Sequence, residues 1–281
     1  MDERPDLQAR ADRVRIIVMG PVGRMGQAVL AEALSDPTVE IVGAVVKPDH
    51  PWVGRDLGMC LGRLPMERRV VSSLDEILHP GDVVIDFTHP DATLAQLPLI
   101  QAVGGALVCG TTGLDAQAMA TLKAFGTHAP VVWAANMSLG VNVLLSLVRQ
   151  ASAMLGSGYD LEVLEIHHKH KKDSPSGTAL ALAAAGLEPR QVPVDDAVTL
   201  RTRGLIGPRG GAEEVGMGVL RGGAVAGEHT VYFFGGGERL ELTHRAVDRR
   251  AFAAGAIRAA RWLKGRPAGF YGMQDVLGLN S

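Results

Sequence analysis

The sequence predicts an α/β protein in which a parallel sheet domain is followed by a second α+β domain with an open mixed sheet. Short β-branched runs recur along the first half of the chain, and each precedes a small or polar turn and a helix-like segment. Strands that alternate with helices in this way are typical of a doubly wound parallel sheet. After Asn142 the pattern changes, and from Val198 onward strand-like runs are separated by Gly-rich turns. This change predicts the second domain.

The strands of the first domain are expected where apolar, β-branched residues cluster, because a strand buried on both faces has no polar alternation. Alternation of polar and apolar residues instead predicts a half-buried strand over residues 160–166. The expected first-domain strands are 14–19, 41–46, 83–87, 106–109 and 131–134, with a helix over 27–34. The expected second-domain elements are a helix over 143–155, the strand 160–166, a helix over 177–185 ended by Gly186, strands over 215–220, 229–234 and 240–244, and a late helix over 251–262 that could return to the first domain.

The composition is that of a compact, Gly-rich enzyme. The chain has 281 residues, 47% hydrophobic and 21% charged, with a net charge of −2. Neither nucleic acid nor an anionic membrane is expected as a partner of a chain so near neutrality. Residues 1–13 contain no apolar core of a secretory signal, and we expect a short disordered arm there. Cys60 and Cys109 form no metal spacing and no disulfide framework, so we expect no metal and a cytoplasmic location.

A glycine loop follows the first strand and opens the first helix. Gly20, Gly23 and Gly26 allow a tight turn and close approach of a pyrophosphate to the helix N-terminus, which predicts a Rossmann-like dinucleotide site. The second glycine comes one residue later than usual, and a purely structural turn is the competing interpretation. Lys47, at the end of the second strand, and Arg24 would attract a 2′-phosphate, so NADPH is expected at least as readily as NADH. The alternative is that Lys47 is an ordinary surface lysine.

The most informative stretch runs from Glu165 to Ala179. Three imidazoles and three ammonium groups fill residues 167–172, and a Pro-Ser-Gly-Thr turn that can open a helix follows. A solvated face or a nucleic-acid patch is the simpler interpretation, but acidic residues flank the run and it follows a strand. A helix start attracts anions, and imidazole can transfer a proton near neutral pH. These features predict a site for a small molecule that carries carboxylates and must be protonated.

Several segments, in order along the chain, give it a resemblance to one family. They are Gly20–Gly26, Asp86–Pro90, Gly110–Gly113, Ala134–Asn142, Glu165–Ala179, Arg221–His229 and Arg239–His244. With them the chain resembles the 4-hydroxy-tetrahydrodipicolinate reductase (dihydrodipicolinate reductase) family. The resemblance implies reduction of a cyclic, dianionic, α,β-unsaturated imine to tetrahydrodipicolinate with NADPH or NADH, in diaminopimelate and lysine biosynthesis. It also implies a homotetramer built through the sheet of the second domain.

The resemblance further implies roles for individual residues. The expected catalytic residues are His167, as general acid, and Lys171; the expected substrate-binding residues are His168, Ser176, Gly177, Thr178 and Arg249. The expected cofactor-binding residues are Gly20, Gly23, Arg24, Met25, Gly26, Lys47, Phe87, Thr88, Gly110, Thr111, Thr112, Ala134, Ala135 and Asn136. Residues 1–137 and 249–281 would then bind the dinucleotide, and residues 138–248 would bind substrate and oligomerise.

The chain departs from the family pattern at a few positions. His89 stands where family members often have arginine or lysine, Lys47 replaces an acid seen in many members, and the segment between Leu200 and Val215 is Gly-rich. Two other functions remain open at this point. One is another two-domain NAD(P)-dependent oxidoreductase, and the other is a dinucleotide sensor without turnover.

Overall fold

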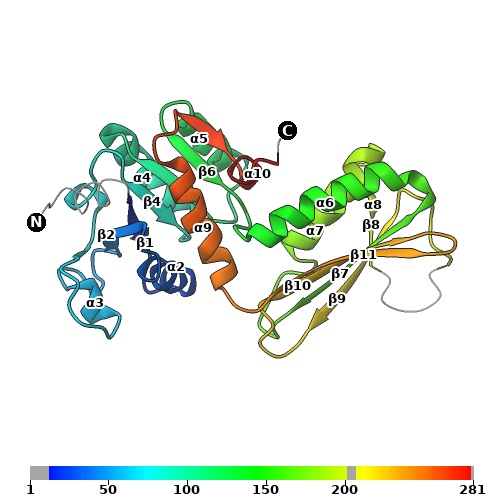
Figure 1. The fold of residues 1–281 in the computed structure, drawn as a ribbon, viewed down its shortest axis with the longest axis horizontal. Coiled ribbons are helices and arrows are strands. Elements are labelled where there is room, and N and C mark those ends of the chain that lie inside the picture. Colours follow the sequence, from blue (N-terminus) through cyan, green and yellow to red (C-terminus); the bar gives the residue numbers. More distant parts are fainter. Residues whose placement is uncertain (1–12, 201–206, 280–281) are drawn as a thin grey trace, which may run out of the picture. The chain divides into compact units, whose positions relative to one another are not determined.

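The computed structural model describes residues 13–200 and 207–279. Residues 1–12 of the predicted N-terminal arm and part of the Gly-rich segment between Leu200 and Val215 therefore lie outside the described residues. The chain forms two compact units (Figure 1): unit 1 comprises Met1–Met137 and Phe252–Ser281, and unit 2 comprises Ser138–Ala251. The second division thus falls three residues after the position that we expected from the sequence.

Unit 1 is built on a seven-stranded sheet in the order β12-β6-β5-β4-β1-β2-β3, and all of its strand pairs are parallel. The strands are β1 Val14–Met19, β2 Val39–Val45, β3 Val70–Val71, β4 Val83–Asp86, β5 Ala106–Cys109, β6 Pro130–Trp133 and β12 Gly269–Tyr271. The order 3-2-1-4-5-6 is that of a Rossmann sheet, with β12 added at one edge. The predicted fold class is confirmed. The edge strands β3 and β12 were not predicted, because two or three residues carry no measurable periodicity.

Helices follow most of these strands. They are α2 Arg24–Leu34, α3 Leu57–Cys60, α4 Pro90–Val103, α5 Ala116–Gly126, α9 Arg250–Leu263 and α10 Met273–Leu277, with a 3₁₀ turn η1 at Leu74–Glu76. Helix α2 begins three residues before the predicted residue 27, because Gly23 is already its N-cap. The apolar residues of the strands are almost fully buried, among them Ile17, Val84 and Leu107, and they form the core of unit 1.

Unit 2 contains a five-stranded mixed sheet in the order β11-β10-β7-β9-β8. Its strands are β7 Asp160–His167, β8 Val198–Thr199, β9 Val215–Arg221, β10 Gly227–Phe234 and β11 Arg239–Ala246; its helices are α6 Leu139–Leu155, α7 Gly177–Leu187 and α8 Val194–Ala197, with 3₁₀ turns η2 Gly156–Gly158 and η3 Glu188–Arg190. Strand β10 is antiparallel to β7 and β11, and β9 is parallel to β7 and β8. The predicted second domain with a mixed sheet is confirmed.

Helices α6 and α7 lie side by side on one face of this sheet (Figure 1). Leu144 and Val148 of α6 and Leu182 of α7 pack against Leu161 of β7 to form the core of unit 2. We had predicted that Gly186 ends α7, and this was wrong. The helix continues to Leu187, and Gly186 is buried within it. A Cβ at Gly186 would lie 2.4 Å from a methyl group of Leu161, so the close approach of helix and strand explains the glycine.

Within the described residues, one segment is long and apolar enough to cross a membrane by those two criteria alone. It is Leu139–Gly158, which is α6 with the turn that follows it, and its mean hydropathy is 1.3. From the sequence we had expected no apolar run near the roughly 18 residues of a spanning helix, and by length and composition this segment contradicts that expectation. Only one face of α6, which includes Leu144 and Val148, lies in the core of unit 2, and 33% of the apolar window is buried.

Candidate functional site

Strand β7 carries polar side chains into the core of unit 2. Its buried residues alternate along the strand, and the series that begins with Leu161 and Val163 continues with Glu165 and His167. Glu165 is fully buried, and 8% of the His167 surface is exposed. Buried carboxylates and imidazoles are costly without hydrogen-bond partners, so the contacts of these two residues define the site.

The carboxylate of Glu165 accepts hydrogen bonds from three residues. Arg221 donates from both terminal guanidinium nitrogens, at 2.7 Å and 2.8 Å, and the backbone N–H of Ser176 donates at 2.9 Å. The third partner is Nδ1 of His167. Burial alone would raise the pKa of Glu165, but these hydrogen bonds outweigh it and hold the pKa below its ordinary value.

The imidazole of His167 lies between this carboxylate and strand β10. Its ring packs edge-on against the ring of His229, with centroids 5.1 Å apart and an interplanar angle of 75°. Its Nε2 atom lies beside Gly227, where an added Cβ would come within 3.1 Å of it. Nδ1 is hydrogen-bonded to Glu165, and Nε2 makes no hydrogen bond within the described part of the chain. The geometry leaves Nε2 as the nitrogen that can meet a ligand.

The charges around His167 oppose one another. Burial lowers the pKa of His167, the hydrogen bond and charge of Glu165 raise it, and the positive charges of Lys171 and Arg221 lower it again. The net effect is a pKa below the ordinary value. The proton is therefore held more weakly here than on a solvated histidine, and an anion bound nearby would reverse part of that effect.

The loop after β7 is hydrogen-bonded to the connection between β9 and β10 and also within itself. The backbone N–H of His168 donates to the carbonyl of Val225 at 2.9 Å, and that of Lys171 donates to the carbonyl of His168 at 3.1 Å. The ammonium group of Lys171 lies 2.8 Å from a carboxylate oxygen of Asp173, and only 20% of the Lys171 side chain is exposed. Lys171 is thus held next to its imidazole neighbours.

Helix α7 begins directly after this loop. The hydroxyl of Ser176 caps the helix by accepting a hydrogen bond from the N–H of Ala179 at 3.1 Å. Gly177 and Thr178 form the first turn, and a Cβ on Gly177 would meet nothing within 4 Å. A helix N-terminus with open space above it is suited to a carboxylate, because the helix dipole is positive there.

Sequence reasoning assigned no role to three residues of this site. Glu165 was considered only as an acidic flank of the basic run, and Arg221 and His229 only as the ends of a matching segment. Nε2 of His229 lies 3.2 Å from the Ser176 hydroxyl, and burial lowers the pKa of His229 to about 4. A signal was present in the sequence, since Arg221 and His229 flank Gly-rich residues between two predicted strands.

Arg249 is the predicted substrate-binding residue that the structure does not join to the others. It lies half-buried in the turn before α9. No hydrogen bond, ion pair or ring contact within the described residues connects it with His167 or with the loop after β7. A contact between Arg249 and substrate therefore stays a prediction.

The glycine loop of unit 1 connects β1 with α2. Gly20 has a φ of +63°, and the N–H of Gly23 donates to the Gly20 carbonyl at 3.0 Å. A Cβ on Gly26 would lie 2.2 Å from that carbonyl oxygen, so the turn can close only over a glycine. The N-cap Gly23 has no side chain to shield the start of α2. This cradle fits a pyrophosphate, as the sequence indicated.

Polar residues at the carboxyl ends of β4 and β5 form a second part of unit 1's candidate site. Asp86 is buried and accepts hydrogen bonds from the backbone N–H and the hydroxyl of Thr88, at 2.8 Å and 2.6 Å, and from Thr93 at 2.7 Å. The Thr93 hydroxyl lies 2.9 Å from that of Thr111. The network holds the predicted segments Phe87-Thr88 and Gly110-Thr111-Thr112 together. Asp86 and Thr93 were not predicted as parts of it.

Two further contacts tie these strand ends together. The ring of Phe87 packs on Gly110, where an added Cβ would lie only 2.0 Å from a ring carbon. The N–H of Ala134 donates to the carbonyl of Cys109 at 3.2 Å, which places the start of the Ala134-Ala135-Asn136 segment beside the end of β5. Ligands of open α/β sheets bind at this edge, where the strand order reverses between β1 and β4. Lys47 and Arg24 are both exposed, and Met25 is half-buried.

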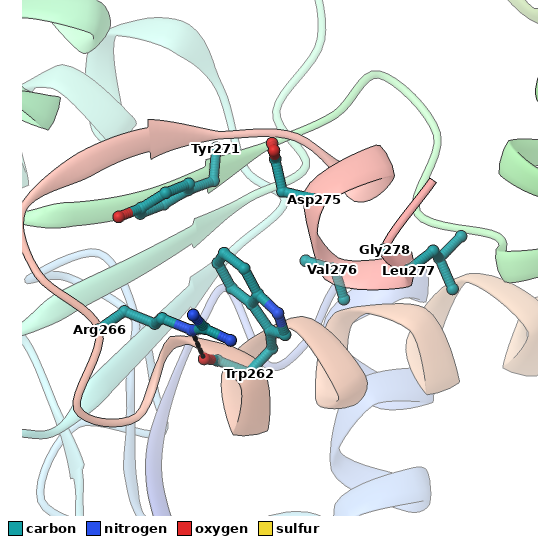
Figure 2. A pocket seen from close by; sticks show the side chains of 7 residues that line it. All are labelled: Trp262, Arg266, Tyr271, Asp275, Val276, Leu277 and Gly278. Carbon is teal, nitrogen blue, oxygen red and sulfur yellow. Dashed lines mark hydrogen bonds between the residues drawn. The ribbon is translucent and has the colours of Figure 1, made fainter. Parts of the chain in front are cut away.

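A separate pocket of about 610 Å³ lies in unit 1 between α9, β12 and α10 (Figure 2). Its aromatic and charged residues already contact one another: the Arg266 guanidinium lies 4.1 Å over the Trp262 ring, and Tyr271 packs edge-on against that ring. None of the predicted site residues lines it. The strand ends of unit 1 and the loop after β7 are therefore the better candidates for the site. Within the described residues, no cluster of three or more His, Cys, Asp or Glu side chains is arranged to hold a metal ion.

Comparison with known proteins finds one family along almost the whole chain. Residues 14–137 match the family model described as dihydrodipicolinate reductase, N-terminus, and residues 140–277 match the one described as dihydrodipicolinate reductase, C-terminus. The chain is 45% identical over 265 residues to the 4-hydroxy-tetrahydrodipicolinate reductase of Anaeromyxobacter dehalogenans (strain 2CP-1), covering 94% of this chain and 98% of that protein. It is 46% identical over 267 residues to the enzyme of the same name from Myxococcus xanthus, with the same coverage.

A solved structure shows the same fold. The dipicolinate-bound dihydrodipicolinate reductase from Paenisporosarcina sp. TG-14 matches with a TM-score of 0.71 and 23% identity, covering 94% of this chain and 99% of that one.

Proposed function

Because the chain belongs to the dihydrodipicolinate reductase family, we propose that it reduces 4-hydroxy-tetrahydrodipicolinate, or the cyclic imine formed from it by loss of water, to tetrahydrodipicolinate. This reaction is a step of diaminopimelate and lysine biosynthesis. The observation that carries the assignment of the site is the hydrogen-bonded pair of Glu165 and His167 directly before an anion-attracting helix start.

Unit 2 would hold the substrate, which is a flat ring with two carboxylates. The first turn of α7, with Gly177 and Thr178 behind the Ser176 cap, would bind one carboxylate through the positive end of the helix dipole. Lys171 and His168 would bind the other, with Lys171 leaving its ion pair with Asp173. Two fixed anchors of this kind orient the ring and stabilise the negative charge that develops during reduction.

His167 would supply the proton that completes the reduction. Its Nδ1 is occupied by Glu165, so the proton would pass from Nε2. The pKa of His167 is below its ordinary value in the absence of a ligand, because of burial. Two substrate carboxylates nearby would raise the pKa again and load the imidazole with a proton when substrate is bound. The donor is then charged when it is needed.

Unit 1 would hold NADPH or NADH, which supplies the hydride when bound. The Gly20–Gly26 loop would bind the pyrophosphate, Phe87 and Thr88 would lie along the pyrophosphate and ribose, and the segments Gly110–Thr112 and Ala134–Asn136 would face the nicotinamide end. Arg24 and Lys47 are exposed cations beside the loop and at the end of β2, where the adenosine ribose is expected. They favour acceptance of the 2′-phosphate of NADPH.

A coupled assay tests this function. Pyruvate, aspartate semialdehyde and a dihydrodipicolinate synthase generate the substrate, and the loss of reduced-nicotinamide absorbance is followed with NADPH and with NADH in separate reactions. Oxidation that requires every component and this chain is the expected result. Absence of oxidation with either cofactor, from folded protein that still binds dinucleotide, would instead indicate a different dehydrogenase or a sensor.

The sheet of unit 2 favours an oligomer, and we propose a homotetramer. Helices α6 and α7 cover one face, whereas the other carries Leu220, which is 52% exposed, and Phe234, which is 37% exposed and stacks on Tyr232. The strand register places Leu220 beside Ile166 on that face. Exposed apolar side chains grouped on a sheet are typical of a subunit interface. A cytoplasmic location, with neither nucleic acid nor membrane as partner, stays our prediction.

A further inference from the structure

Glu165 is a buried anion whose contacts exceed what the fold of β7 requires. A strand in the core of unit 2 would be served equally well by an apolar residue at this position, as it is by Leu161 and Val163 on the same face. Ionised carboxylates are buried only where hydrogen bonds and opposite charges compensate the loss of water. Glu165 is fully buried, and its two oxygens accept hydrogen bonds from three residues.

Arg221 is the residue that keeps this carboxylate charged. It ends β9, directly beside His167 in the strand register, and its two terminal nitrogens bind the two oxygens of Glu165. The same guanidinium also donates to the carbonyl of Asp173 at 2.8 Å, in the loop that precedes α7. A two-pronged bond of this kind fixes both the charge and the orientation of a carboxylate. Glu165 is therefore held in one position by a cation that lies beside His167.

A carboxylate that is ionised can only accept hydrogen bonds. Since Oε2 of Glu165 is paired with Nδ1 of His167, the hydrogen of this contact must be on the histidine. A neutral His167 then carries its proton on Nδ1 and leaves the lone pair of Nε2 exposed beside Gly227. A charged His167 carries a transferable proton on Nε2. The contact thus selects one of two tautomers.

We propose that Glu165, held by Arg221, is a positioning residue that fixes the tautomer of His167 and favours its charged form, so that Nε2 alone exchanges a proton with the substrate. This inference rests on the function proposed above, in which His167 is the proton donor. In other acid–base sites, a carboxylate hydrogen-bonded to the catalytic histidine sets the orientation of the ring and stabilises the imidazolium. Glu165 would have the same two effects on His167.

The other groups that face His167 determine how its protonation would change if the negative charge of Glu165 were removed. Lys171 from the loop and Arg221 from β9 are positive and oppose the charged imidazole, and His229 from β10 is neutral near pH 7 because burial lowers its pKa to about 4. Glu165 is the anion among these neighbours. Replacing it by glutamine would leave His167 beside two cations without compensation. The fraction of His167 that is protonated at a given pH would then fall.

The test compares Glu165→Gln with Glu162→Gln. Glu162 lies on the same strand, but its side chain is only partly buried and pairs with Arg209, so it is a matched control. For Glu165→Gln we expect kcat near pH 7.5 to fall by about 10²-fold and the alkaline limb of its pH profile to move down by about one pH unit. KM for the substrate is expected to change little. Glu162→Gln should keep both the rate and the profile.

A second readout does not depend on the folding of Glu165→Gln. In ¹⁵N-labelled wild-type protein, long-range ¹H–¹⁵N correlation spectra report which imidazole nitrogen carries hydrogen, and the His167→Gln spectrum assigns the signal. The expected result is a protonated Nδ1 at high pH. An Nε2-protonated neutral ring, or a rate loss in Glu165→Gln with no movement of the pH profile, would overturn the inference. A wild-type chain without reductase activity would overturn the proposed function instead, and the tautomer would still be measured.

Discussion

Nε2 of His229 lies 3.2 Å from the hydroxyl of Ser176, the residue that caps α7. The contact links strand β10 to the helix start that we propose as a carboxylate site. Only 3% of the His229 surface is exposed, and its Nδ1 has no hydrogen-bond partner among the described residues. The fold therefore holds His229 neutral. The cost of charging His229 therefore becomes a pH-dependent part of the stability of unit 2.

His229→Gln should weaken the dependence of stability on acid. An unfolded histidine has a pKa of about 6.5, whereas burial lowers the pKa of His229 to about 4. Between these values the unfolded chain binds a proton that the folded chain does not, so the stability is fully present above about pH 6.5 and is lost as the pH falls towards 4. From pH 7 to pH 5 the wild type should lose about 2 kcal/mol through this residue.

Urea unfolding at pH 7 and at pH 5 measures this difference. The variant should show the smaller loss between the two pH values, whatever its stability at pH 7. His128→Asn, at an exposed position, is the control and should lose as much as the wild type. Equal losses in His229→Gln and the wild type would show that folding does not lower the pKa of His229.

Lys47→Glu should change the choice of cofactor. The substitution replaces an exposed cation at the end of β2 with an acid that can bind the ribose hydroxyls of NADH and repels the 2′-phosphate of NADPH. We expect the ratio of kcat/KM for NADPH to that for NADH to fall at least tenfold, and kcat with NADH to be preserved. An unchanged ratio would make Lys47 an ordinary surface residue.

Gly26→Ala should abolish dinucleotide binding or the folding of the loop that supports it. Its Cβ would lie 2.2 Å from the Gly20 carbonyl oxygen, which is backbone and cannot move without opening the turn. Gly158→Ala is the matched control, because a Cβ there meets nothing within 4 Å. Titration calorimetry with NADPH is the measurement. Wild-type affinity in Gly26→Ala would mean that the loop does not contact the pyrophosphate.

Leu220→Glu should disrupt the proposed homotetramer. Leu220 is 52% exposed on the uncovered face of the unit 2 sheet, and a carboxylate there would have to be buried in an interface. Light scattering coupled to gel filtration should show a tetramer for the wild type and smaller species for the variant. Leu64→Glu, at an 85% exposed position in unit 1, should leave the mass unchanged. A monomeric wild type would end the proposal.

The sequence was sufficient for the elements whose periodicity is long or unambiguous. The β-branched runs beginning at Val14 and Val83 and the alternating run beginning at Asp160 are strands in the structure, as predicted. The strand β3 and the strand β12 were missed, because so few residues form them and sheet pairing with distant residues decides their conformation. Gly186 was misread as a helix end, because its reason is a strand that packs against it rather than a turn.

The candidate site shows the same division. The residues of the loop from His167 to Thr178 are close in sequence, and local pattern was enough to select them. Glu165 is buried by residues of the unit 2 core that are distant in sequence, so its burial could not be predicted from the local pattern. Its partner Arg221 is 56 residues away along the chain. In unit 1, the hydrogen bonds of Asp86 to Thr88 and Thr93 depend on how α4 starts after β4. Contacts between distant segments therefore carry the part of the site that the sequence did not reveal.

The turnover of His167→Gln in the coupled assay tests the central claim most directly. Loss of the proton donor should lower kcat by about 10²–10⁴-fold, because general acid catalysis contributes that much. Dinucleotide affinity and the binding of pyridine-2,6-dicarboxylate, a dianionic ring probe, should stay within a few-fold of the wild type. A His167→Gln enzyme with near-normal turnover would contradict the account and place the proton donor elsewhere in the molecule.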